Sequence, residues 1–153
     1  MARLRHQVAL LEEAVARGGS TAAVRWHARA SIRYAVRIAA KVSIQRAEIH
    51  QLAGRIWWLL GRYARALRSW ERALAAGQQM GARPELARTW ALAGECLADG
   101  GGQLLGLDGP ACLARSLEMF QALGLEREAE HTRQHTSSAA SAPRTLRASG
   151  APW

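Results

Sequence analysis

The sequence predicts an all-α protein in which antiparallel helical hairpins stack into a short α-solenoid. Apolar residues recur at helical spacing through most of the chain, and no segment shows the sustained alternation of apolar and polar residues typical of a strand. Glycine and proline divide the periodic stretches into segments of helix length. The stretch from Ala47 to Ala73 is half-repeated forty residues later, and an internal period of this length is typical of helical repeat proteins.

The first two helices are predicted from one apolar stripe each. The stripe of the first helix consists of Leu4, Val8, Leu11 and Val15. A Gly-Gly pair at 18–19 ends this helix, and Ser20 or Thr21 can cap the second with a side-chain oxygen. The second helix is expected to continue to about Val42. Its predicted apolar face consists of Trp26, Ala30, Tyr34 and Ile38.

The third and fourth helices are predicted to form a tight hairpin. The third is expected from Gln45 to Leu60, Gly61 makes the turn, and the fourth is expected from Tyr63 to about Gln79. The apolar residues of the third helix are Ile49, Leu52, Ala53, Ile56 and Trp57.

Three further helices complete the prediction. Helices are expected at 84–99 and 110–123, and each begins with a proline. Proline suits the first turn of a helix, because a backbone N–H at that position would have no acceptor within the helix. The glycine-rich segment 100–109 between them is expected to be a flexible connector, and a short last helix is expected at 126–134. Residues 136–153 offer little to bury and are predicted to be a disordered tail.

The two repeat copies are expected to supply the core. Small side chains let antiparallel helices approach closely, and large ones fill the space between one hairpin and the next. The predicted repeat-core residues are Ala53, Gly54, Trp57, Tyr63, Ala66, Trp70, Trp90, Gly94 and Phe120. Trp58 is the aromatic residue expected to be exposed. This set resembles the diagnostic positions of the tetratricopeptide repeat (TPR), which implies a TPR-like α-solenoid that binds another protein.

Residues 43–135 are also similar to the C-terminal repeat region of large bacterial signalling ATPases. The resemblance rests on Ser43–Ala47, Ala53-Gly54, Trp57-Trp58, Leu60–Arg62, Ala66, Trp70, Ala73-Leu74, Met80-Gly81, Glu85–Ala87, Gly94, Phe120 and Leu123-Gly124. In those proteins the repeats follow an ATPase domain, with associated cyclase, kinase or DNA-binding domains. The resemblance implies a regulatory repeat region at 43–135. The apolar stripes predict an N-terminal helical hairpin at 1–42 before it, and composition predicts the disordered tail at 136–153 after it.

The sequence predicts no enzyme, no cofactor, no metal and no membrane association. It contains no Gly-x-x-x-x-Gly-Lys-Ser/Thr loop, no readable secretory signal and no run of about 18 apolar residues. Glutamates and histidines form no recognisable catalytic grouping. Cys96 and Cys112 are expected to be small buried thiols in a cytoplasmic protein.

The net charge of +9 is concentrated in the first half of the chain. Residues 1–75 carry 14 basic and four acidic side chains, whereas residues 76–153 carry seven and eight. The basic residues form a ridge on the second helix and a second face on the fourth: Arg25, Arg29, Arg33, Arg37 and Lys41, and then Arg62, Arg65, Arg68 and Arg72. Like charges at i,i+4 repel. The ridge is therefore either a solvated face whose stems cover apolar surface, or a docking strip for an acidic protein or nucleic-acid phosphates.

One histidine pair has metal-ligand spacing. His131 and His135 are four residues apart, and Glu128 lies one turn before His131, so the three could share one helical face. We expect no metal there, because a terminal helix offers no rigid surroundings for the ligands.

These observations favour a non-catalytic protein–protein interaction module. Its basic residues are the predicted contact surface, and its partner is not identified by the sequence. So short a stack leaves apolar faces uncovered, which predicts either self-association or neighbouring repeats from a longer parent. The alternative is a basic helical protein that binds nucleic acid non-specifically through its arginine ridge.

Overall fold

The computed structural model describes residues 2–17, 22–39 and 45–141. These residues form seven helices: α1 (Ala2–Ala16), α2 (Ala22–Ala39), α3 (Arg46–Leu59), α4 (Tyr63–Gln79), α5 (Arg83–Gly100), α6 (Gly109–Ala122) and α7 (Glu126–Ser141). The described parts contain no strand beyond an isolated bridge between Leu104 and Leu107. The all-α prediction is therefore confirmed. None of the helices described is both long and apolar enough to cross a lipid bilayer.

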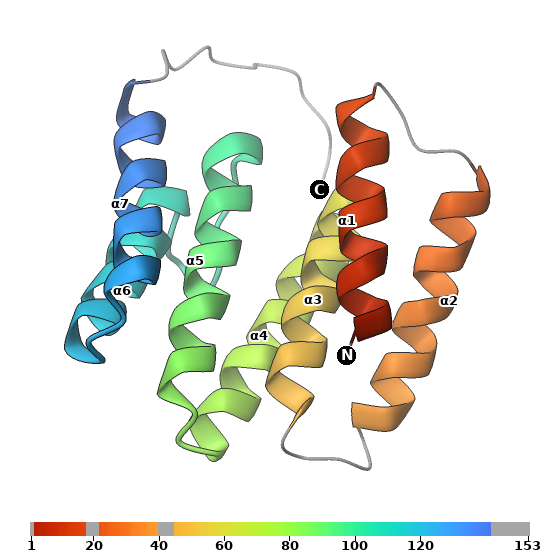
Figure 1. Ribbon diagram of the computed structural model, residues 1–153, viewed down its shortest axis with the longest axis horizontal. Coiled ribbons are helices and arrows are strands. Elements are labelled where there is room, and N and C mark those ends of the chain that lie inside the picture. Colours follow the sequence, from red (N-terminus) through yellow and green to blue (C-terminus); the bar gives the residue numbers. More distant parts are fainter. Residues whose placement is uncertain (1, 18–21, 40–44, 142–153) are drawn as a thin grey trace.

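Helices that follow one another along the chain pack against each other. Helices α1 and α2, α3 and α4, and α5 and α6 contact each other pairwise, and α7 contacts both α6 and α5. Contacts also join helices that are two apart in the chain: α3 contacts both α1 and α5. Figure 1 shows α7, α5, α3 and α1 side by side across the molecule, with α6 and α4 behind this row.

Glycine makes the tight turns on either side of α4. Gly61 and Gly81 have φ values of 69° and 63°, a region that favours glycine. At the first turn, the N–H of Arg62 donates to the carbonyl of Trp57 at 2.8 Å, and the N–H of Gly61 donates to that of Trp58, also at 2.8 Å. This bonding pattern ends α3 in a Schellman motif. The bounds expected for the fourth helix, Tyr63–Gln79, are those observed.

The main apolar core lies between α4, α5 and α6. Its buried residues are Ala66, Trp70, Leu74, Trp90, Ala93, Cys96, Leu97, Leu104 and Cys112. Trp70 is fully buried, and its indole Nε1 donates to the Gln51 carbonyl at 3.3 Å. Among the other predicted repeat-core residues, Ala53, Gly54, Gly94 and Phe120 are also buried, whereas Trp57 is half-buried between two clusters.

Two aromatic residues differ from their predicted exposure. Tyr63, predicted to fill space between hairpins, is 45% exposed. Trp58, predicted to be exposed, is half-buried. Its ring lies 4.7 Å from that of Tyr63 and 5.7 Å from that of Trp70, between centroids. The close approach of Gly100 on α5 gives Trp58 its cover, a long-range contact that helix periodicity does not reveal.

A second cluster joins α1, α2 and α3, and here the predicted face of α2 is wrong. Trp26 and Tyr34 are 60% and 62% exposed, whereas Ala28 and Ile32 are buried. Both pairs are apolar stripes at helical spacing, so periodicity alone cannot choose between them. The smaller pair allows α2 to approach its neighbours closely. The side chain of Ile38 lies outside the described residues.

Two segments are more ordered than expected. The connector after α5 is anchored by Leu104, which is fully buried, and Leu104 and Leu107 exchange backbone hydrogen bonds of 2.8 and 3.0 Å. Asp108 then caps α6 by accepting from the N–H of Ala111 at 2.9 Å. The last helix continues to Ser141, because the chain has no glycine or proline from 125 to 141. Residues 142–153, the rest of the predicted tail, lie outside the described residues.

Candidate functional site

The predicted contact residues lie on α2 and α4. On α2, Arg25 and Arg33 are exposed and Arg29 is half-buried. On α4 and the turn before it, Arg65 and Arg62 are exposed. The side chain of Arg37 and all of Lys41 lie outside the described residues.

A basic pocket between α2, α3 and α4 brings some of these residues together. Its volume is about 420 Å³, and its lining residues are Ile32, Arg33, Val36, His50, Trp57, Arg65, Arg68, Ser69 and Arg72. We call this the basic pocket. Arg65, Arg68 and Arg72 follow at i, i+3 and i+7, so α4 presents all three on one face. Its opposite face carries Trp70, whose burial fixes the rotation of the helix.

The residues that line the basic pocket carry positive charge and no negative charge. None of the lining residues is Asp or Glu. Within the described parts of the chain, none of its four arginines forms an ion pair, although arginines elsewhere do. The Arg65 guanidinium instead lies 5.0 Å from the centroid of the Trp57 ring, a cation–π contact that holds it at the edge of the pocket.

The pKa of His50 reflects the positive charge around the basic pocket. Its pKa is lowered, first by burial and then by the positive charges of Arg72 and Arg46. The imidazole is therefore held in its neutral form next to a cluster of guanidinium groups. An anion that enters the pocket would favour the protonated form of His50 and would accept hydrogen bonds from the guanidinium groups that line the pocket.

A second surface, which we call the inner groove, shares α3 with the basic pocket. It has a volume of about 590 Å³ and is lined by residues of α3, α5, α6 and α7: Gln51, Arg88, Ala91, Leu92, Glu95, Phe120, Arg127, Glu128, His131 and Thr132. Both charge signs are present. Arg88 Nη2 and Glu128 Oε1 lie 3.2 Å apart, which joins α5 to α7.

The structure changes the grouping expected around the terminal histidines. Glu128, the predicted neighbour of His131 and His135, is bound by Arg88. The carboxylate that approaches the histidines is that of Glu95 on α5, whose Oε1 lies 3.9 Å from His131 Nδ1. Glu95 precedes His131 by 36 residues, so no local spacing could identify it. Local spacing likewise gives no sign that His50 on α3 shares a pocket with Arg33 of α2 and Arg72 of α4.

Comparison of the chain with models of protein families, with curated proteins and with solved structures finds no match. The chemistry of the two surfaces must therefore be inferred from their own side chains. The basic pocket offers guanidinium donors and no carboxylate. The inner groove offers a mixture of paired charges.

Proposed function

We propose that this protein is a non-catalytic interaction module whose basic pocket binds an acidic segment of a partner protein. In this proposal the hairpins form a short TPR-like solenoid, with the odd-numbered helices in one layer and the even-numbered helices in the other. The contacts of α3 with α1 and α5, and of α7 with α5, support that arrangement. Such stacks expose extended surfaces suited to binding other chains.

The observation that carries the proposal is a cluster of four arginines that form no ion pair within residues 2–17, 22–39 and 45–141. Arg33, Arg65, Arg68 and Arg72 come from two helices and converge on one cavity. Like charges held together raise the free energy of the folded protein, and an anionic ligand would relieve that repulsion. Guanidinium groups bind carboxylates in bidentate geometry, which suits the glutamate and aspartate side chains of a peptide.

A protein partner fits the pocket better than nucleic acid does. Proteins that bind single strands without sequence preference pair a basic groove with exposed aromatic rings for base stacking. Trp57, the only aromatic residue among the lining residues apart from His50, is half-buried and already covered by Arg65. Ile32 and Val36 add an apolar wall that suits aliphatic side chains of a peptide. Nucleic acid remains the second candidate because the first 75 residues carry a net +10.

The resemblance of residues 43–135 to repeats of bacterial signalling ATPases leads to a more specific proposal. In this proposal the chain is the regulatory repeat region of such a protein, or a remnant of one, and acts in the cytoplasm. Both cysteines are free and buried, which supports a reducing compartment. A neighbouring reading frame that encodes an ATPase domain would support the relationship.

The binding proposal is tested with a fluorescein-labelled, glutamate-rich peptide and fluorescence anisotropy. Replacing both Arg68 and Arg72 by Gln should weaken binding about tenfold or more, because each lost charged hydrogen bond contributes about 1.5–3 kcal/mol. Arg83→Gln with Arg127→Gln is the matched control, since both residues are exposed and lie outside the basic pocket. Equal weakening in the two variants would show attraction to net charge alone and would overturn the assignment to the pocket.

A further inference from the structure

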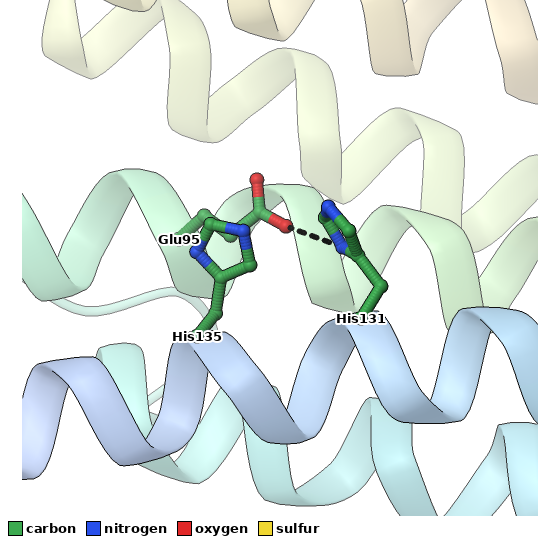
Figure 2. Close-up of side chains that lie close together, drawn as sticks. All are labelled: Glu95, His131 and His135. Carbon is green, nitrogen blue, oxygen red and sulfur yellow. Dashed lines mark ion pairs between the residues drawn. The ribbon is translucent and has the colours of Figure 1, made fainter.

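We propose that Glu95, His131 and His135 form a binding site for a divalent transition-metal ion of the zinc class, which joins α7 to α5. One potential ligand atom from each residue can be chosen so that all three lie within 4.8 Å of one another. Figure 2 shows the two imidazole rings on α7 and the carboxylate on α5 gathered in the space between the helices. This site is separate from the basic pocket and does not depend on the function proposed for it.

The spacing of the two histidines along α7 allows both to bind the same metal ion. His131 and His135 are four residues apart on α7, so they lie on the same face one turn apart. Their ring centroids are 4.7 Å apart and their planes are inclined by 49°. That spacing allows one nitrogen of each ring to turn toward a common point.

Glu95 supplies the third ligand from the neighbouring helix. Its side chain is only 21% exposed, whereas that of His131 is 64% exposed. A half-buried carboxylate in the last third of α5 gives the site a ligand from a second helix, which α7 by itself lacks. From the sequence we expect no metal here, because all three candidate ligands lie on the terminal helix. In the structure one of the three ligands comes from α5 instead.

The distances are close to those that a metal requires. Tetrahedral zinc with bonds of about 2.0–2.2 Å holds its ligand atoms roughly 3.3 Å apart. His131 Nδ1 and Glu95 Oε1 are already 3.9 Å apart. Rotation of the two exposed imidazoles can close the remaining distance without movement of either helix.

The donor set selects the class of metal. Two imidazole nitrogens and one carboxylate oxygen suit Zn²⁺, and also Co²⁺ or Ni²⁺, whereas Mg²⁺ and Ca²⁺ prefer ligand sets made of oxygen. Three protein ligands leave the fourth tetrahedral position for water or for a donor from another molecule. Glu95 and His131 also line the inner groove, which places the proposed site at its wall.

The metal would stabilise the C-terminal end of the fold. The core beneath α7 is a small cluster of buried residues, Ala87, Phe120 and Ala129. A ligand that binds only the folded arrangement of α5 and α7 stabilises it by mass action. Amide hydrogens of α7 should therefore exchange more slowly when zinc is bound.

The site is tested with the full chain, free of any polyhistidine tag and stripped of metal with a chelator. Titration with ZnCl₂ in a calorimeter should show one ion bound per chain, and Co²⁺ should give visible ligand-field absorption. Glu95→Gln, His131→Gln and His135→Gln should each lower zinc affinity about tenfold or more, as expected for loss of one of three ligands. Circular dichroism establishes that each variant is folded.

Two controls make the result specific. His27→Gln removes an exposed histidine on α2, and Glu126→Gln removes an exposed carboxylate at the start of α7. Both should bind zinc as the parent does. Absence of zinc binding would overturn the proposal and leave only an ion pair between Glu95 and His131. Retention of affinity in Glu95→Gln, or loss of affinity in Glu126→Gln, would overturn the ligand assignment.

Discussion

The indole ring of Trp70 lies directly against the backbone of Gly54. A Cβ atom placed on Gly54 would be 2.2 Å from Trp70 Nε1 and 2.4 Å from its Cδ1. The absence of a side chain at Gly54 thus allows α4 to pack its largest residue against α3. Since Trp70 is fully buried, this contact fixes the separation of the two helices that carry most of the basic pocket.

Gly54→Ala should destabilise the protein. The added methyl group would overpack the contact with Trp70, which typically costs about 1–3 kcal/mol. Helix propensity alone predicts the opposite, a gain of about 1 kcal/mol for Ala over Gly. Urea unfolding measures the difference. In a Trp70→Leu background the penalty should shrink, and a penalty of unchanged size would show that the clash is not its cause.

Trp70→Ala should cost about 3–5 kcal/mol of unfolding free energy, as large truncations in a close-packed core do. Tyr63→Ala is the matched control, because Tyr63 is an aromatic residue on the same helix that is 45% exposed. Its replacement should cost about 1–2 kcal/mol, chiefly for the lost ring contact with Trp58. Similar losses in the two variants, measured by denaturant unfolding, would contradict the observed packing.

How much of this arrangement could be predicted depends on the range of the interactions. The tight turn at Gly61 and the bounds of α4 follow from local signals, and both were predictable. Which of the two apolar stripes on α2 is buried depends on how closely that helix approaches α1 and α3. The spacing of apolar residues in the sequence gives no information on this approach. The convergence of His50 with arginines of two other helices likewise depends on tertiary packing.

The two thiols should make stability fall at high pH. Burial raises the pKa of Cys96 and of Cys112 to about 11, whereas an unfolded thiol ionises around pH 9. Between pH 9 and pH 11 the thiols of the unfolded chain lose their protons, whereas those of the folded protein keep them. The contribution of the neutral buried thiols to the free energy of unfolding is therefore complete below pH 9 and declines toward pH 11. Urea unfolding over this range should show a steeper loss for the parent than for a variant with both cysteines replaced by Ala. Parallel curves would contradict the prediction.

His50 should respond to an anion in the basic pocket. Burial, with the charges of Arg72 and Arg46, lowers its pKa in the free protein. The folded state therefore holds fewer protons than the unfolded state below about pH 6.5, and stability should decline as pH falls through that region. A glutamate-rich peptide should raise the pKa of His50, followed by NMR titration of its ring protons. An unchanged titration curve at saturating peptide would place the peptide elsewhere.

Competition between an acidic peptide and an oligonucleotide tests the central claim most directly. Both ligands are labelled, matched in length and charge, and measured by anisotropy between about 50 and 200 mM salt, where phosphate binding falls steeply. We predict that the peptide binds more tightly across this range, and that Arg68→Gln with Arg72→Gln removes its advantage. An oligonucleotide that binds more tightly and displaces the peptide would contradict the account and identify a nucleic-acid-binding protein.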